Sequence, residues 1–214
     1  MNHSTINEAL NWRYATKKFD TSKKISALDW KVLQNALTMA PSSYGLQPFK
    51  FFVVENPEVR EKLKASSWNQ GQVTDASHYV VFAAKEKLDE EFIQKYINRI
   101  AEVRGVSQES LDGFKSSMVE ALIKGPCAKT IDSWAQRQAY ISMGFLMETA
   151  ALLNIDACPM EGFDPQSYDK ILNLEGTGWK TVSTVALGYR HPDDAYQNLK
   201  KVRFSDETLI EYVK

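Results

Sequence analysis

The stretch Asn11-Trp12-Arg13-Tyr14-Ala15-Thr16-Lys17-Lys18-Phe19-Asp20 places two fixed cations, Arg13 and Lys17, four residues apart. Upstream, Thr5 and Glu8 have the spacing of a capping box, so we expect a short N-terminal helix that starts there and ends near Arg13. Lysine and arginine are common at the carboxyl end of a helix, where they offset the helix dipole. Taken alone, the stretch is therefore weak evidence for an anion-binding site.

The composition is typical of a globular protein with one core. Of 214 residues, 43% are hydrophobic and 25% are charged, and 26 Lys plus Arg nearly balance 27 Asp plus Glu. We predict a single domain over residues 1–214, with no strong field to attract nucleic acid or membrane. The N-terminus is polar and no run of about 18 apolar residues occurs, so we expect a cytoplasmic protein without a membrane span.

The two cysteines, Cys127 and Cys158, are too few for a disulfide framework or a zinc site. No pair among the three histidines has the spacing of metal ligands, so we expect no metal centre. Any chemistry in this chain is then expected to come from side chains or from an organic cofactor.

Capping signals and helical periodicity predict helices over much of the chain. The predicted helices are one that Ser26 and Asp29 cap and Pro41 ends, one from Asn56-Pro57 to about Lys64, a charged region 89–124 that breaks near Gly105, the long helix 131–153, and a short one from Asp164-Pro165. Strand signals occur at Phe51–Val54, Tyr79–Phe82, around Ala157 and at Thr181–Leu187. Few strands among long helices predict an α+β fold in which helices sandwich a sheet.

Three further segments suit the same ligand as the first stretch. They are Pro41-Ser42-Ser43-Tyr44-Gly45-Leu46-Gln47-Pro48, Pro159-Met160-Glu161-Gly162-Phe163-Asp164 and Lys200-Lys201-Val202-Arg203. Together the four segments resemble the flavin-dependent nitroreductase family, in its NAD(P)H:FMN oxidoreductase branch. The resemblance runs almost from end to end, and the four segments come in the order found in the family.

The resemblance implies a nitroreductase-like fold with a central, mostly antiparallel sheet, and an intertwined homodimer with FMN at the subunit junction. The long helix 131–153 is apolar on more than one side. On residues alone, core packing and a subunit interface are both open for that surface, and the resemblance favours the interface.

The residues that the resemblance assigns to FMN are Arg13, Tyr14, Ala15, Lys17, Pro41, Ser42, Ser43, Gln47, Asn69, Gln72, Pro159, Met160, Glu161, Gly162, Lys201 and Arg203. Arginine suits a phosphate because its planar fork makes paired, charge-assisted hydrogen bonds, so Arg13 and Arg203 are expected to grip it with Lys201. Lys17 would stabilise charge near N1 of the reduced ring.

The other assigned residues face the ring. The amide of Asn69 would meet the N3–H and C4 carbonyl edge, and the backbone of Glu161-Gly162 would direct an N–H at N5. Glycine lets this main chain approach closely, and the carboxylate of Glu161 is expected to be structural. No catalytic side chain is predicted, because the chemistry belongs to the flavin.

Two positions depart from the usual family pattern. Tyr44-Gly45-Leu46 replaces a more polar sequence in the serine loop, which leaves that loop's contacts open. Gln72 stands where many relatives carry a second lysine, so we expect a reduced flavin that is less stabilised and has a lower potential. Phe114 and Met118 are either core residues or part of the pocket mouth, and packing is the simpler explanation.

The implied activity is ping-pong hydride transfer from NADH or NADPH to nitroaromatics, quinones or flavins. The choice of nucleotide stays open, because no Gly-x-Gly-x-x-Gly motif is present. The alternatives are pteridine reduction within the same family, an FMN storage or sensor protein without turnover, and a helical interaction protein without cofactor. The last leaves the four segments unexplained.

Overall fold

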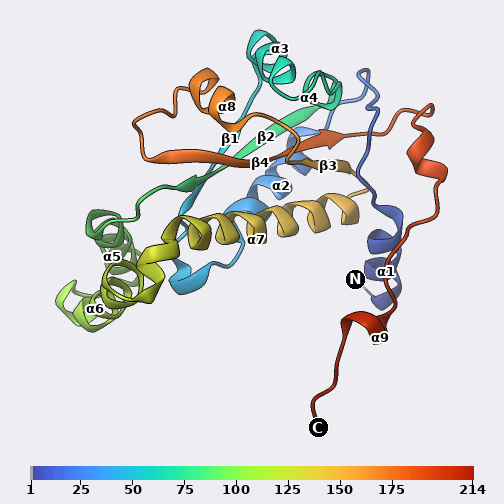
Figure 1. Cartoon of the computed structure of the whole chain (residues 1–214). Coiled ribbons are helices and arrows are strands. Elements are labelled where there is room, and N and C mark those ends of the chain that lie inside the picture. Colours follow the sequence, from blue (N-terminus) through green and yellow to red (C-terminus); the bar gives the residue numbers. More distant parts are fainter. Residues whose placement is uncertain (1) are drawn as a thin grey trace.

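A computed structural model describes residues 2–214 and places a four-stranded antiparallel sheet at the centre of the molecule (Figure 1). The strand order is β1-β2-β4-β3, with β1 at Phe49–Val53, β2 at His78–Lys85, β3 at Asp156–Met160 and β4 at Trp179–Gly188. The helices are α1 (His3–Trp12), α2 (Ala27–Met39), α3 (Pro57–Ala65), α4 (Gln72–Asp75), α5 (Glu90–Arg104), α6 (Asp112–Val119), α7 (Ile131–Leu152), α8 (Pro165–Ile171) and α9 (Asp206–Leu209).

Alternation along β2 divides its side chains between two helical layers. Tyr79 and Val81 pack in a core with residues of α3, α4 and α8, whereas Val80 and Phe82 pack with residues of α2 and α7 on the opposite face. Figure 1 shows α3, α4 and α8 above the sheet and α2 and α7 below it. The predicted α+β fold with an antiparallel sheet between helical layers is confirmed.

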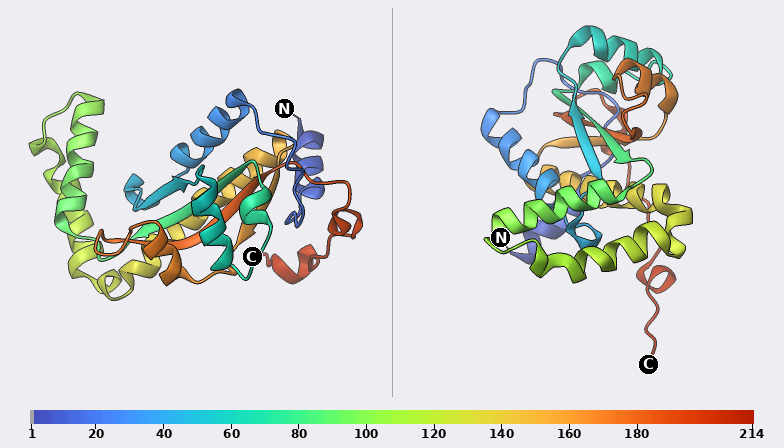
Figure 2. Two further views of the ribbon diagram at one scale, coloured as in Figure 1. Left: turned by 90° about the horizontal axis from the view of Figure 1, so that it is seen from above. Right: turned by 90° about the vertical axis from the view of Figure 1, so that its left-hand side faces the viewer.

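A third apolar cluster lies beyond one end of the sheet. It joins α5 and α6 to the beginning of α7 and includes Ile93, Ile97, Met118 and Trp134. The left view of Figure 2 shows these helices projecting from the body of the molecule at the end opposite α1. The helical region 89–124 was therefore predicted correctly, including its break at Gly105, which ends α5 in a left-handed conformation (φ 64°).

The N-terminal cap differs from the prediction. Asn2 caps α1, since its Oδ1 accepts from the Thr5 N–H at 2.9 Å and from the Thr5 hydroxyl. The helix therefore begins at His3, and the expectation that Thr5 and Glu8 start it was wrong. The caps at Ser26, Asn56 and Asp164 are confirmed, each by a side chain that accepts a backbone N–H.

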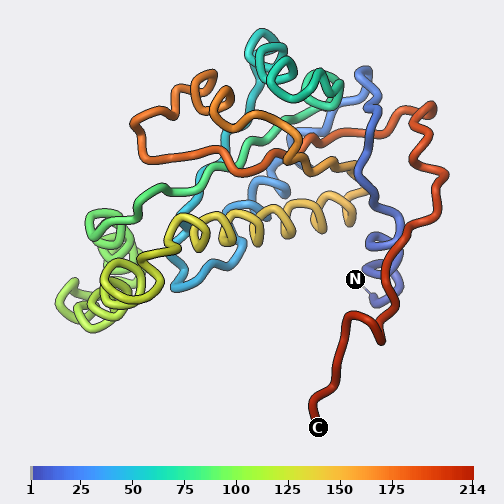
Figure 3. Tube along the Cα trace, in the orientation of Figure 1, coloured from blue at the N-terminus to red at the C-terminus, as the bar shows by residue number. Residues whose placement is uncertain are grey.

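The C-terminal segment carries apolar side chains into solvent. Residues from Leu199 onward run beside α1 and then leave the body of the protein (Figure 3). Val202, Phe204, Tyr212 and Val213 are each more than 70% exposed. Isolated exposed apolar residues are common on proteins, whereas here several of them follow one another along one segment. Within residues 2–214, no helix is both long and apolar enough to cross a bilayer.

Candidate functional site

The segment after α1 is extended and pairs with the sheet. The Arg13 N–H still bonds to the Ala9 carbonyl, which closes the helix, and the chain then becomes extended. Ala15 forms a parallel bridge with Ala157 of β3, and the Thr16 N–H donates to the Ala157 carbonyl. The helix end is therefore anchored to the rim of the sheet, and the two cations predicted from the sequence have fixed backbones.

The two ends of the chain meet over this segment. A cavity of about 440 Å³ is lined by both ends, and its walls include six predicted residues: Arg13, Tyr14, Ala15, Lys17, Lys201 and Arg203. The Lys201 ammonium donates to the carbonyls of Leu10 and Arg13, which joins the C-terminal segment to the end of α1. The structure thus brings together the first and the last of the four sequence segments.

The cations in this cavity lack an anionic partner. Burial, and next the charge of Arg203, lower the pKa of Arg13, and burial with the charges of Arg13 and Arg203 lowers the pKa of Lys201. The buried Nε of Arg13 has no hydrogen-bond partner. None of Arg13, Lys201 and Arg203 forms an ion pair with a carboxylate of residues 2–214. An anion with several oxygens, such as a phosphate, fits this arrangement.

Asp194 holds the segment in place, and sequence reasoning did not find it. This carboxylate is 2% exposed, and its Oδ2 accepts from the Lys17 N–H (2.7 Å), the Lys18 N–H (3.1 Å) and the Tyr14 hydroxyl (3.0 Å). Burial opposes ionisation of Asp194, but these donors and the Tyr196 N–H together lower its pKa. Burial and the bond to Asp194 raise the pKa of Tyr14 to about 12.

A second carboxylate, Asp156, holds Arg190 behind the same segment. Arg190 lies against Asp156 with Nε and Nη2 at 2.8 and 2.6 Å from Oδ1. Its guanidinium carbon stands 4.1 Å from the ring centroid of Trp12 and 4.6 Å from that of Tyr14. Trp12 and Tyr14 flank Arg13 in sequence, so this contact fixes the backbone on both sides of Arg13.

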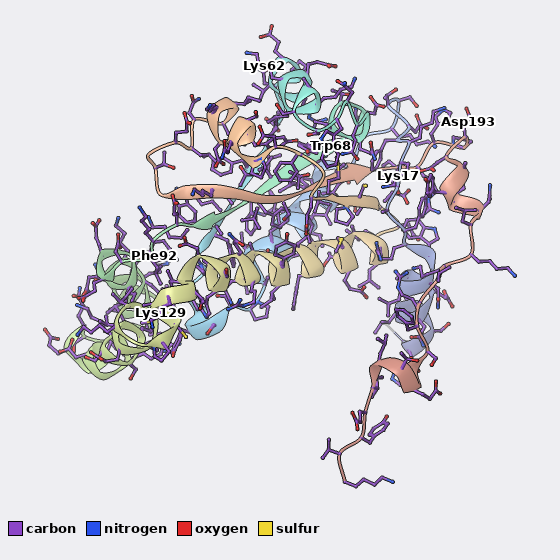
Figure 4. The ribbon with its side chains drawn as sticks, in the orientation of Figure 1. Lys17, Lys62, Trp68, Phe92, Lys129 and Asp193 are labelled. Carbon is purple, nitrogen blue, oxygen red and sulfur yellow. The ribbon has the colours of Figure 1, made fainter. Side chains whose placement is uncertain are left out.

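The predicted ring-binding residues lie along the neighbouring rim of the sheet. The Lys17 ammonium is 4.0 Å from the buried thiol of Cys158, and Gln72 of α4, which is 6% exposed, lies near that thiol. Burial raises the pKa of Cys158, and the nearby Lys17 and Gln72 partly offset that rise. Asn69 follows Trp68 at the start of this region, and both have left-handed backbones (φ 56° and 52°). Figure 4 shows Lys17 and Trp68 on the same side of the molecule.

The turn after β3 offers unused donors. Pro159 and Met160 end the strand, and the N–H groups of Glu161 and Gly162 donate to no protein group within residues 2–214. The Gly162 carbonyl accepts from the Gln70 side chain at 2.8 Å. A Cβ on Gly162 would lie 2.5 Å from the Trp68 ring, so glycine is required here by close approach.

The serine loop is held elsewhere. The Ser43 N–H donates to Gln138 of α7 (2.9 Å), the Gln47 N–H donates to the Ser42 hydroxyl (3.0 Å), and the Gln47 amide donates to the Thr38 carbonyl. Gln138 lies in the first half of α7, whereas Ala15 pairs with the strand that follows its end. The rise of an α-helix places these points roughly 20 Å apart. One chain therefore does not bring Pro41, Ser42, Ser43 and Gln47 to the Arg13 cavity.

Phe114 and Met118 of α6, whose roles the sequence left undecided, lie in different surroundings. Met118 is fully buried in the cluster of α5 and α6, in agreement with a packing role. Phe114 is 38% exposed, and its ring centroid is 6.2 Å from that of Tyr44 in the serine loop. Phe114 thus lies beside Tyr44 of a loop that the sequence assigns to the site.

Comparison with known proteins agrees with this geometry. The model of the Nitroreductase family matches residues 10–189. "Putative NAD(P)H nitroreductase YfkO" of Bacillus subtilis is 37% identical over 220 residues, which cover 97% of each chain. A relative of the same description from Staphylococcus saprophyticus is 35% identical and covers 98% of this chain and 97% of its own length.

Solved structures share the fold. The nitroreductase ydfN of Bacillus subtilis superposes with a TM-score of 0.83 at 24% identity and covers 99% of this chain and 100% of its own. A nitroreductase from Exiguobacterium sibiricum, solved in complex with FMN, has a TM-score of 0.79 at 18% identity over 97% of both chains. The chain therefore belongs to the nitroreductase family of oxidoreductase enzymes.

Proposed function

We propose that this protein binds FMN and, by a ping-pong mechanism, passes a hydride from NADH or NADPH to nitroaromatics, quinones or flavins. The observation that carries the proposal is the cavity in which Arg13, Lys201 and Arg203 meet without an ion pair to a carboxylate of the described chain, and in which the buried Arg13 Nε has no hydrogen-bond partner. Two relatives are named as NAD(P)H nitroreductases, and one structural neighbour was solved with FMN, which supports the same assignment.

The chain's own residues would bind and orient the cofactor, while the isoalloxazine ring supplies the hydride chemistry. Arg13, Lys201 and Arg203 hold the phosphate, and Asp194 and Arg190 keep Arg13 in place from behind. Lys17 brings a positive charge to the ring, next to Cys158 and Gln72. The free N–H groups of Glu161 and Gly162 serve as donors to the ring edge, with Asn69 beside them.

A homodimer completes the site in this proposal. The exposed side of α7 forms an apolar groove lined by Tyr140, Ile141, Gly144, Phe145, Glu148 and Thr149. Ile141 and Phe145 are 41% and 46% exposed, and a Cβ on Gly144 would meet nothing within 4 Å, so another helix can approach closely. The apolar C-terminal segment offers a second surface for the same partner.

The geometry of α7 explains why a second copy is the right partner. In a twofold dimer the same groove faces itself, and the two copies of α7 run antiparallel when the axis is perpendicular to the helix, which is the arrangement we propose. The beginning of one helix comes to lie beside the end of the other. The serine loop of one subunit, which bonds to Gln138, thereby reaches the Arg13 cavity of its partner. Each of two equivalent sites would take residues from both chains.

The first test is the visible spectrum of the purified protein, followed by anaerobic addition of NADH or NADPH. We expect flavin absorption bands whose intensity corresponds to about one FMN per subunit. These bands should bleach when NADH or NADPH is added and return with menadione or a nitroaromatic. Bands that persist after both nucleotides would indicate a flavin-storing protein, and selective reoxidation by a quinonoid dihydropterin would indicate a pteridine reductase. Absence of bands, even after FMN is added, would contradict the proposed site.

A further inference from the structure

The longest helix of the fold is hydrogen-bonded to the turn that follows β3. The hydroxyl of Tyr140, in the middle of α7, donates to Oε1 of Glu161 at 2.6 Å, across 21 positions of the chain. Burial, and next the bond to Glu161, raise the pKa of Tyr140. The hydroxyl therefore stays protonated, and available as a donor, throughout the neutral range.

Besides the buried side chain of Phe163, which packs against Tyr168 of α8, two hydrogen bonds from other segments hold the turn from Glu161 to Asp164. The Gly162 carbonyl accepts from Gln70, and the Asp164 N–H donates to the Ser66 carbonyl at 2.9 Å. Both bonds come from the segment between α3 and α4, on one side of the turn. Tyr140 supplies the attachment from the α7 side, and it is the one that acts on Glu161. Without it, the peptide that carries the free N–H groups is held from one side.

We propose that Tyr140 is a positioning residue that acts through Glu161 to aim the free N–H groups of Glu161 and Gly162 at the flavin edge. This inference rests on the proposed function and deepens it. In this role the Tyr140–Glu161 pair transfers no proton; the Tyr140 hydroxyl only donates a hydrogen bond to Oε1 of Glu161. The pair instead fixes a backbone whose donors are otherwise unused.

The position of Tyr140 also connects the turn to the proposed subunit contact. Tyr140 lies in the apolar groove of α7 with Ile141, Gly144 and Phe145. A second subunit that covers this groove would exclude water from the Tyr140–Glu161 bond, and a hydrogen bond strengthens when its surroundings become less polar. Dimerisation would then stiffen the turn beside the flavin, although neither N–H group lies in the groove itself.

The test compares Tyr140→Phe with wild type and with Tyr189→Phe, which removes a hydroxyl from a half-buried tyrosine whose side chain makes no hydrogen bond within the described chain. In the FMN-free protein, amide exchange of peptide 160–164 should become about tenfold faster in Tyr140→Phe, since local opening sets exchange rates. In the FMN-loaded protein, the rate constant for bleaching by NADH at saturation should fall about tenfold, because small misplacements of catalytic groups have effects of this size. The NADH concentration for half-saturation should stay unchanged, and Tyr189→Phe should match wild type in every measurement.

A double-mutant cycle with Glu161→Ala, which removes the acceptor of the Tyr140 hydroxyl, isolates the route of the effect. If Tyr140 acts through Glu161, Tyr140→Phe has little further effect on exchange or bleaching in the Glu161→Ala background. Equal effects of Tyr140→Phe in both backgrounds would overturn the inference. A wild type that binds and bleaches FMN, with unchanged exchange and rate in Tyr140→Phe, overturns the inference and leaves the proposed function intact. A wild type that binds no FMN overturns both.

Discussion

The two groups of candidate site residues are held in the fold in different ways. Around Arg13, two buried carboxylates, Asp156 and Asp194, fix the backbone through several charge-assisted bonds, and three cations converge on one cavity. The serine loop 42–47 contains no charged residue and is held by single bonds to neighbouring helices. Tyr44, Gly45 and Gln47 in this loop all have positive φ values.

This difference shows which part of the site one chain can build alone. A phosphate grip needs several cations at fixed places, and the mutual repulsion of those cations has to be offset within the same subunit by well-held backbone. A loop that supplies neutral hydrogen bonds to a ligand can instead be presented to a partner. Strained backbone in the loop is consistent with a functional role, because such conformations persist where the surroundings impose them.

The largest expected effect comes from breaking the proposed contact between two copies of α7, which would bring the serine loop of one subunit to the Arg13 cavity of the other. Phe145→Asp places a carboxylate in the apolar groove of α7, where desolvation costs several kcal/mol per subunit. We expect a monomer by light scattering and loss of FMN binding, because each site would lose the partner's loop. Val103→Asp, at a 65% exposed position of α5, is the control and should remain a flavin-binding dimer. A Phe145→Asp monomer with wild-type FMN affinity would show that one chain suffices.

Arg13→Ala tests the cationic group by itself. We expect FMN affinity to fall by roughly 10- to 100-fold, since hydrogen bonds to charged groups contribute about 1.5–3 kcal/mol. Binding of riboflavin, which has no phosphate, should change little, so fluorescence titration with both ligands separates phosphate recognition from ring recognition. Lys129→Ala removes a cation from the opposite end of the molecule (Figure 4) and should alter neither titration. Equal losses for both ligands would place the phosphate elsewhere.

Asp194→Asn tests the carboxylate that holds the segment around Arg13 in place. An amide leaves donors at Lys17, Lys18 and Tyr14 poorly matched, so the free energy of unfolding should fall by about 2 kcal/mol. Asp193→Asn changes the adjacent, 70% exposed partner of Lys18 and should cost less than about 1 kcal/mol. Urea titrations of the two variants give the two free energies of unfolding. Similar losses in Asp194→Asn and Asp193→Asn would contradict a specific stabilising role for Asp194.

The pH dependence of Asp194 has a defined sign. Its pKa is lower in the folded protein than the ordinary 3.8, so its contribution to stability is present above that pH and is lost as the pH falls through the folded value. Wild type should therefore lose stability more steeply than Asp194→Asn below about pH 4. Parallel curves for the two proteins in that range would contradict the assignment.

The smallest expected effect concerns the charge beside the ring. Gln72→Lys adds an ammonium near Lys17 and should raise the flavin midpoint potential by about 30 mV, which corresponds to ~1.4 kcal/mol for two electrons. Gln166→Lys adds the same charge at an exposed position of α8 and is the control. An unchanged or lowered potential in Gln72→Lys alone would refute the expectation that glutamine leaves the reduced flavin less stabilised.

Local signals in the sequence predicted most helices because their causes are local. Ser26 and Asn56 cap helices through bonds that span two or three residues, and Pro41 follows the end of α2. The predicted start of the first helix was wrong because Asn2 caps it: the Thr5 N–H donates to Asn2 Oδ1, so Thr5 already lies inside the helix. Helix α4, only four residues long and without a side-chain cap, gave no signal.

The cations of the candidate site were predicted from a resemblance, whereas the carboxylates that hold them in place, Asp194 and Asp156, were not predicted. Asp194 bonds to Lys17 across 177 positions, and Asp156 meets Arg190 across 34. Nothing in the sequence distinguishes Asp194, which is buried, from its exposed neighbour Asp193. An unpaired acidic residue within a predicted buried strand, such as Asp156, is the one clue that could have pointed to a buried ion pair.

The contact between Arg13 and the Lys201–Arg203 segment also has a consequence for the order of events in the cell. The Lys201 ammonium meets the Arg13 carbonyl across 188 positions, so one side of the phosphate cavity leaves the ribosome near the beginning of synthesis and the other near its end. Closing so long a loop is slow compared with forming the helices between. If these residues hold the FMN phosphate as proposed, the nascent chain has no complete phosphate site until residue 203 has been made, and cofactor capture is a late step that follows folding of the sheet.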